Sequence, residues 1–314
     1  MPHTVRMDTT ARGVFVISAT PFTPSGDIDW SSLDRLLEFY LSHGVHGITL
    51  LGMMGEAQKL SDTESETVVR RALQRIGGRV PVVVGVSGGS LTQMRVLSDL
   101  AMEHGASAVM VAPISGLRTD DQIAGYVRSV CEALGDVPVV YQDYPPTTNV
   151  WLGASLWARL IAAHPQLVML KAEDHPGLDK LTAIRTAEGA DTIRRSSITV
   201  GNGGIFLPQA LQRGADGIMT GFSFPEMLVE VYNRHRAGDI SGSEDCYERY
   251  LPLVSYELQP GYGLAVRKEI LRRGGAISHG AVRAPGPKLS ATDHREIDRL
   301  LERLGERLGR TVTS

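Results

Sequence analysis

Short apolar runs alternate with helix-like segments along most of this chain. Eight runs read as strands, near residues 14–18, 47–51, 80–86, 107–112, 137–141, 167–171, 197–201 and 216–220. Helix-like segments lie between them, near residues 31–43, 62–76, 91–104, 119–134, 153–163, 176–187 and 204–212. Strict alternation of buried strands and amphipathic helices predicts a parallel sheet. Eight such units predict an α/β fold closed into a (β/α)8 TIM barrel rather than an open sheet.

The remainder of the chain is helical. Residues 227–236 would form the eighth barrel helix, and three more helices are expected near 244–254, 264–273 and 292–308. We therefore expect residues 1–224 to form the barrel through its eighth strand. Residues 225–314 would supply the last barrel helix and a C-terminal helical extension of the same structural unit, because they are too short for a large core of their own.

Composition excludes several classes of protein. The 314 residues carry a formal net charge of −3, which gives no electrostatic reason to expect nucleic acid or a membrane surface as a partner. The two cysteines are far apart and show neither metal-ligand spacing nor a disulfide framework. Residues 1–12 hold no apolar stretch long enough for a signal peptide, and the chain has no apolar run of 18 residues, so no transmembrane helix is expected. We expect a cytoplasmic protein without a metal ion.

A lysine closes the sixth apolar run. Leu167 to Leu170 are followed directly by Lys171, and then by Ala172, Glu173 and Asp174. A lysine at the end of a buried strand meets a cavity or the solvent, and burial favours its neutral amine. A neutral amine can attack a carbonyl group and form a Schiff base. The alternative is a strand-end lysine that points into water.

A tyrosine ends the neighbouring fifth run. Adjacent strands lie about 4.8 Å apart, so the phenol of Tyr141 and the amine of Lys171 could face one reacting carbonyl group. The amine would be the nucleophile and the phenol a proton shuttle; the alternative for Tyr141 is a place in the core at the barrel rim. Glu173 is a candidate general base, although a capping or ion-pair role is favoured.

Several short motifs follow one another in a defined order. They are Thr20-Pro21-Phe22, Gly52 to Glu56, Tyr141, Lys171, Gly201, Gly214 to Gly217 and Val282 to Pro285. In this order they resemble the dihydrodipicolinate synthase / N-acetylneuraminate lyase superfamily, over about residues 12 to 308. The resemblance implies an imine between Lys171 and pyruvate or a related 2-oxo acid, with Tyr141 as the proton shuttle. It also implies no cofactor, a probable aldehyde as second reactant, and a homotetramer built from dimers.

The chain departs from this superfamily in the expected substrate site. The superfamily loop usually reads Gly-Thr-Thr-Gly-Glu and holds the carboxylate of pyruvate, whereas Met53 and Met54 stand here and cannot donate hydrogen bonds. They either line the pocket or simply pack. Ser115 is the nearest match to a second tyrosine of the synthases, and no arginine follows the fifth strand. Gly201 and Met219, at the ends of strands seven and eight, complete the expected substrate-binding residues.

Three functions remain open. The first is a Schiff-base lyase or aldolase acting on pyruvate or another 2-oxo acid, in which a carbon–carbon bond is made or cleaved or water is eliminated. The second is a 4-hydroxy-tetrahydrodipicolinate synthase with an altered carboxylate site, which the missing hydroxyls and arginine disfavour. The third is a barrel that binds a small molecule without turnover. The sequence Gly201-Asn202-Gly203-Gly204 could be a phosphate loop, but a tight strand-to-helix turn is favoured.

Overall fold

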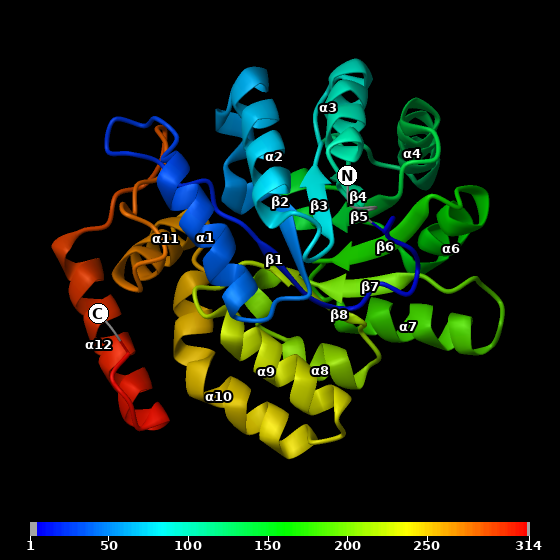
Figure 1. Ribbon diagram of the computed structural model, residues 1–314. Coiled ribbons are helices and arrows are strands. Elements are labelled where there is room, and N and C mark those ends of the chain that lie inside the picture. The colour runs from blue at the N-terminus through cyan, green and yellow to red at the C-terminus, as the bar shows by residue number, and fades with distance from the viewer. Residues whose placement is uncertain (1–4, 313–314) are drawn as a thin grey trace.

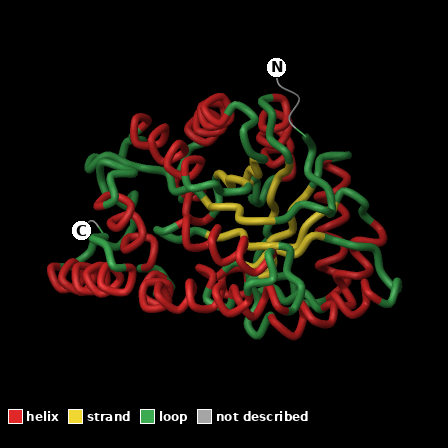
Figure 2. The backbone as a smooth tube through the Cα atoms, turned by 60° about the horizontal axis from the view of Figure 1, so that its bottom comes forward, coloured by secondary structure: helices red, strands yellow, loops and turns green. Residues whose placement is uncertain are grey.

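Eight parallel strands form a closed barrel in chain order, as the alternating pattern predicts. The structure is a computed structural model that describes residues 5–312. The ring of helices encloses the strands (Figure 1, Figure 2). The strands are β1 (Gly13–Ile17), β2 (Gly47–Leu50), β3 (Val82–Gly85), β4 (Ala108–Val111), β5 (Val139–Asp143), β6 (Leu167–Ala172), β7 (Ser197–Val200) and β8 (Gly217–Thr220). The outer limits of the two predicted units, residues 1 and 314, lie outside the described residues.

Helices follow the strands where amphipathic segments are predicted. The barrel helices are α1 (Trp30–Ser42), α2 (Asp62–Ile76), α3 (Leu91–Glu103), α4 (Asp120–Leu134), α6 (Ala154–Ala163), α7 (Leu178–Gly189), α8 (Leu207–Gln212) and α9 (Pro225–Arg236). Side-chain caps fix several starts: Ser61 and Thr119 form capping boxes before α2 and α4, and Asp29 caps α1.

Short helices that the sequence analysis did not predict lie in the loops above the strands. They are the 3-10 helices η1 (Met53–Gly55), η2 (Ala57–Lys59) and η3 (Asn202–Gly204), and the four-residue α5 (Pro145–Thr148). In η3, Gly203 has a φ of 62°, which is a left-handed conformation that glycine tolerates without steric cost. The segment after β7 is a tight turn into α8, in agreement with the favoured prediction.

The C-terminal extension comprises α10 (Ile240–Glu257), α11 (Gly263–Arg273) and α12 (Ala291–Leu308). These helices lie together at one side of the barrel (Figure 1). Lys268 of α11 is fully buried, and its Nζ donates to Glu56 Oε1 at 2.5 Å and to the carbonyl oxygens of Thr20 and Ala281 at 2.8 and 2.9 Å. One buried amine therefore connects the extension to the loops after β1 and β2.

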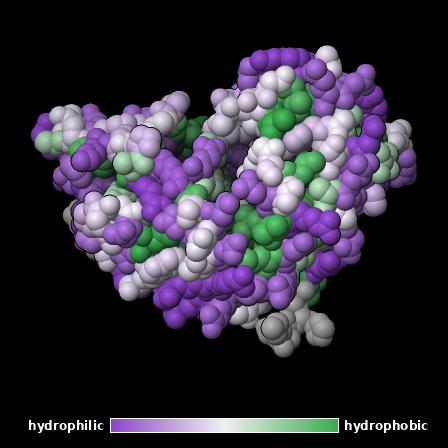
Figure 3. All heavy atoms as spheres, turned by 90° about the horizontal axis from the view of Figure 1, so that it is seen from above, coloured by the Kyte–Doolittle hydropathy of each residue, from purple (hydrophilic) through white to green (hydrophobic). Residues whose placement is uncertain are grey.

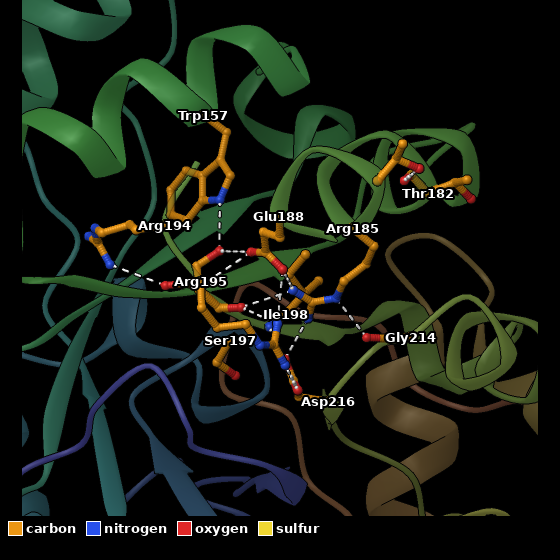
Figure 4. Close-up of polar contacts among 12 residues, drawn as sticks. Trp157, Thr182, Arg185, Glu188, Arg194, Arg195, Ser197, Ile198, Gly214 and Asp216 are labelled. Carbon is orange, nitrogen blue, oxygen red and sulfur yellow. Dashed lines mark hydrogen bonds and ion pairs between the residues drawn. The ribbon is translucent and has the colours of Figure 1, made fainter. Parts of the chain in front are cut away.

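Ion pairs also hold the opposite end of the barrel. At the N-terminal ends of β7 and β8, Arg185 contacts the carboxylates of Glu188 and Asp216, and Arg195 contacts the same two groups (Figure 4). Trp157 donates to the hydroxyl of Ser196 in the same cluster. Catalytic sites of TIM barrels form at the carboxyl ends of the strands. This cluster lies at the other end, so we assign it a structural role.

The surface is predominantly polar in the view from above, where hydrophobic residues form small separate patches (Figure 3). Within residues 5–312, no helix combines the length and the apolar character that a membrane span requires. Cys131 and Cys246 are both buried and unpaired, in α4 and α10.

A buried ion-pair triad lies beside β5 and β6. Lys180 of α7 places its Nζ 2.6 Å from Asp143 Oδ2 and 2.6 Å from Asp174 Oδ2. Burial raises the pKa of Asp143 to about 6, although the positive charge of Lys180 opposes this shift. The triad fixes the segments that follow the last residues of β5 and β6.

We predict that Lys268→Met lowers the free energy of unfolding by about 3 kcal/mol, because Glu56 then loses its buried partner. The double variant Lys268→Met/Glu56→Gln should recover much of this loss. Urea denaturation measures both, with Arg70→Ala as control, since that exposed ion pair with Glu66 is worth less than about 1 kcal/mol. Equal losses in Lys268→Met and Arg70→Ala would contradict the assigned role of Lys268.

Asp143 predicts a pH dependence of stability. Its pKa is higher in the folded protein than the ordinary value of 3.8, so its protonated form favours the folded state. This contribution is present below about pH 4 and is lost as the pH rises through 6. The free energy of unfolding of the wild type, measured relative to Asp143→Asn, should therefore fall between pH 4 and pH 7 by at most about 3 kcal/mol. A difference that rises with pH over this range would refute the assignment.

Candidate active site

A cavity of about 380 Å³ opens at the carboxyl ends of the strands. Its volume lies in the range of small-molecule sites. The barrel contributes side chains from the loop after β2 and from the ends of β5, β6 and β8, and the C-terminal extension supplies a further wall. The residues used below are Met53, Met54, Lys59, Gln142, Tyr144, Lys171, Glu173, Gly203, Gly221, Glu257 and Arg267.

Lys171 lies in this cavity near the end of β6. Its residue surface is 1% exposed, so the alternative of a lysine that points into water is excluded. Its register partners are Gln142 of β5 and Thr199 of β7. The Nζ atom lies 2.7 Å from Glu173 Oε2. An amine and a carboxylate thus meet inside the barrel mouth.

Glu173 is held in place from several sides. Oε2 accepts a hydrogen bond from Gln142 Nε2 at 2.7 Å, and Oε1 accepts one from the backbone N–H of Asn202 at 3.3 Å. A Cβ atom on Gly201 would lie 2.2 Å from Oε1. Gly201 therefore makes room for this carboxylate rather than lining the cavity. The ion pair favoured by the sequence analysis is present, and its partner is the candidate nucleophile.

Tyr141 does not face Lys171. The register of β5 and β6 pairs Gln142 with Lys171 and Tyr141 with Leu170, and successive side chains of a strand point to opposite faces. The ring of Tyr141 packs instead against Trp157 of α6, with centroids 6.1 Å apart. The expected juxtaposition of phenol and amine is thus wrong, because β5 continues to Asp143 and places Gln142 on the inner face.

Another tyrosine, which the sequence analysis did not single out, lines the cavity. Tyr144 directly follows β5 and precedes α5. Burial and the negative charge of Glu173 raise the pKa of its phenol, so the phenol stays protonated at neutral pH. The motif Tyr144-Pro145 was visible in the sequence, but two tyrosines lie close together there and no feature of the pattern distinguishes them.

The expected substrate-binding residues are divided by the structure. Met53 and Met54 both line the cavity, Met53 with 47% of its surface exposed. Ser115 is exposed in the loop after β4, and Met219 is fully buried in β8; neither lines the cavity. Gly201 contacts Glu173 as described above. The substrate-binding roles of these five residues stay predictions. Only Met53 and Met54 lie where they could contact a substrate in the cavity.

The extension contributes an ion pair to the cavity wall. Arg267 of α11 donates from Nε to Glu257 Oε2 at 2.6 Å, and both residues line the cavity. The arginine expected after β5 in the synthases has no equivalent there, but a guanidinium reaches the cavity from a different element. Sequence reasoning missed it because α11 lies about 95 residues beyond β6 in the chain, and no local pattern relates them.

This arrangement suits carbonyl chemistry. The amine of Lys171 is a candidate nucleophile, and the carboxylate of Glu173 can accept or return a proton beside it. The protonated phenol of Tyr144 is a second donor. Arg267 supplies positive charge for an anionic substrate. The side chains required for imine formation and proton transfer therefore converge on one cavity.

Comparison with known proteins identifies the family of the chain. Residues 10–304 match the family described as the dihydrodipicolinate synthetase family. An L-2-keto-3-deoxyarabonate dehydratase of Azospirillum brasilense is 29% identical, over 93% of this chain and 94% of that protein. A 4-hydroxy-tetrahydrodipicolinate synthase of Stenotrophomonas maltophilia is 31% identical, over 92% and 94%.

A solved structure is similar over nearly its whole length. The crystal structure of a dihydrodipicolinate synthase from Rhodopseudomonas palustris has a TM-score of 0.93 and 44% sequence identity, over 95% of this chain and 99% of that chain. Fold and sequence therefore agree with the resemblance seen in the motifs. The chain belongs to the dihydrodipicolinate synthetase family, whose TIM-barrel lyases and dehydratases act on pyruvate or a related 2-oxo acid.

Proposed function

We propose that this protein is a dehydratase of a hydroxylated 3-deoxy-2-oxo acid and that it works through an imine at Lys171. The observation that carries the proposal is the contact of 2.7 Å between Lys171 Nζ and Glu173 Oε2. A dehydration of this kind needs an amine at the carbonyl carbon and a base at the next carbon. One carboxylate beside the imine nitrogen can act at that carbon.

The reaction begins with attack of the Lys171 amine on C2 of the substrate. A carbinolamine forms and loses water, which leaves a protonated imine at C2. This imine withdraws electrons from the bond between C3 and its hydrogen. Glu173 then removes a C3 proton, and the electron pair becomes the double bond of an enamine.

Elimination follows from the enamine. The nitrogen lone pair re-forms the imine at C2, the electron pair of the C2=C3 bond becomes a C3=C4 double bond, and the bond from C4 to its hydroxyl breaks. The leaving hydroxyl takes a proton from the Glu173 carboxyl group or from Tyr144. The phenol can serve because it carries its proton at neutral pH, where burial and the charge of Glu173 hold its pKa above the ordinary value. Hydrolysis of the conjugated imine releases the product and restores the amine. The water used in hydrolysis balances the water lost on imine formation, so one water is eliminated overall.

One relative supports dehydration through its name. The Azospirillum brasilense protein is named as a dehydratase of a 2-keto-3-deoxy acid and is similar over 93% of this chain. The substrate class proposed here is the one that its name contains. The homotetramer that the resemblance implies and the cytoplasmic location expected from the composition belong to the same proposal.

A second candidate is the 4-hydroxy-tetrahydrodipicolinate synthase reaction. The 44% identity to the Rhodopseudomonas palustris protein favours it. In that reaction the enamine of pyruvate would add to an aldehyde, and the aldehyde oxygen would need a proton donor. Gln142 occupies the inner position on β5 where Tyr141 was expected, and an amide is not an acid, so Tyr144 would have to be that donor. Dehydration accounts better for the carboxylate of Glu173, which lies beside the amine of Lys171 and can act as the base at the next carbon.

Reductive trapping tests the imine. Incubation with pyruvate and borohydride should add the mass of one reduced pyruvate to the wild type, and a peptide map should place it on Lys171. Lys171→Ala should gain no mass. Lys288→Ala is the matched control, because that lysine is exposed and is not among the residues that line the cavity. An adduct on another residue, or none with any 2-oxo acid, would rule out the proposed chemistry.

Glu173→Gln tests the base. We expect kcat for dehydration of 2-keto-3-deoxyarabonate to fall by about 10²- to 10⁴-fold, while borohydride still traps an imine. Product formation is followed by proton nuclear magnetic resonance. Asp174→Asn is the control, because this adjacent carboxylate pairs with Lys180, and its kcat should change less than about threefold.

The same assay separates the two candidate reactions. Wild-type protein should dehydrate the 3-deoxy-2-oxo acid faster than it condenses pyruvate with aspartate semialdehyde. Faster condensation would assign the synthase reaction instead. Unchanged dehydration by Glu173→Gln would remove this carboxylate from the mechanism.

A further inference from the structure

We infer that Arg267, a residue of the C-terminal extension, binds the carboxylate of the 2-oxo acid whose carbonyl group reacts with Lys171. The inference rests on the proposed function, because it assigns a substrate-binding residue of the same cavity. Its ligand class is a monocarboxylate with the charge next to the reacting carbon. The loop after β2 would no longer provide that contact through side chains.

The guanidinium of Arg267 is held by one ion pair, and some of its N–H donors have no partner within residues 5–312. Nε donates to Glu257 Oε2 at 2.6 Å, and this side-chain carboxylate is fully buried. Among the residues that the structure describes, neither Nη1 nor Nη2 has a hydrogen-bond partner. The side chain is 10% exposed and lines the cavity. Two parallel donors on a rigid fork fit the two oxygens of a carboxylate.

Two glycines locate the fork. If Gly221 carried a Cβ atom, that atom would lie 3.3 Å from Nη1 of Arg267. A Cβ atom on Gly203 would lie 3.9 Å from Nη2. Gly221 follows β8, and Gly203 lies in η3 after β7. Met54 Sδ also packs against Gly221, 1.6 Å from its hypothetical Cβ. The fork therefore sits between the ends of β7 and β8, beside the methionine that replaces a carboxylate-binding hydroxyl.

The other cations of the cavity are already paired. Lys171 Nζ contacts Glu173. Lys59 Nζ donates to Glu56 Oε2 at 2.8 Å and to the carbonyl oxygen of Arg283 at 2.7 Å. Met53 and Met54 offer no donor side chain. The cationic donors of this cavity that lack a partner in the described part of the chain are therefore those of Arg267. A carboxylate that enters the cavity would bind there, because burying a charged group without a partner is costly.

The decisive experiment compares ligands with and without the carboxylate. Pyruvate and acetone carry the same methyl ketone, and only pyruvate is charged. Lactate carries the carboxylate but has no carbonyl group, so it reports binding without an imine. The variant is Arg267→Gln/Glu257→Gln, which removes both members of the buried pair and avoids leaving Glu257 as an unpaired buried charge.

We expect the variant to need about 10- to 100-fold more pyruvate for half-maximal trapping, since a charge-assisted contact is worth about that factor. Trapping of acetone should be unchanged, and lactate should lose affinity by a similar factor in isothermal titration calorimetry. Arg267→Lys, which keeps the charge but loses the fork, should fall between wild type and the double variant.

Each outcome has one meaning. Equal weakening of pyruvate and acetone would show a general effect on the cavity and would overturn the inference. Unchanged affinity for pyruvate and lactate would also overturn it. If the wild type forms no imine at all, the proposed function fails, but lactate binding still decides whether Arg267 holds a carboxylate.

Discussion

A buried amine–carboxylate contact organises the mouth of this barrel. Lys171 and Glu173 are separated by one residue and meet with only 1% and 6% of their surfaces exposed. Two charges of opposite sign can be buried together only when hydrogen bonds satisfy their remaining groups. The amide of Gln142 and the backbone N–H of Asn202 do this for Glu173. The ends of β5, β6 and β7 are therefore all fitted to one pair of side chains.

The contact also explains two residues that surround it. A carboxylate beside the lysine requires a small residue at Gly201, because a Cβ there would collide with Oε1. It gives Gln142 a partner on the inner face of β5. Glutamine at that place positions the carboxylate, and the proton chemistry then passes to Glu173 and Tyr144. Gly201 and Gln142 are thus parts of one arrangement around Glu173.

The fold was predictable to within a few residues, and the reason is physical. All eight strands are buried on both faces or nearly so, which produces continuous apolar runs that are easily found. The same burial removes the alternation that reveals which residues point inward. The register also shifts between Val139 and Val140. The sequence analysis ended the fifth strand at Tyr141 and placed its phenol beside Lys171, whereas β5 extends to Asp143 and Gln142 takes the inner position.

The candidate site was predictable only in part. Lys171 could be found because a charged residue that closes an apolar strand is conspicuous. Glu173 was noticed, but its contact with Lys171 depends on the turn of the chain after β6. Arg267 could not be found, because its place in the cavity depends on how α11 packs on the barrel. That packing depends on Lys268, whose buried contacts join segments more than 200 residues apart.

The central claim is that Lys171 forms an imine and that Glu173 moves a proton at the adjacent carbon. Exchange of the methyl protons of pyruvate in D2O, followed by proton nuclear magnetic resonance, measures both steps without a second substrate. The account predicts rapid exchange by the wild type, none above background by Lys171→Ala, and exchange slowed at least tenfold by Glu173→Gln. Exchange by Glu173→Gln at the wild-type rate would contradict it.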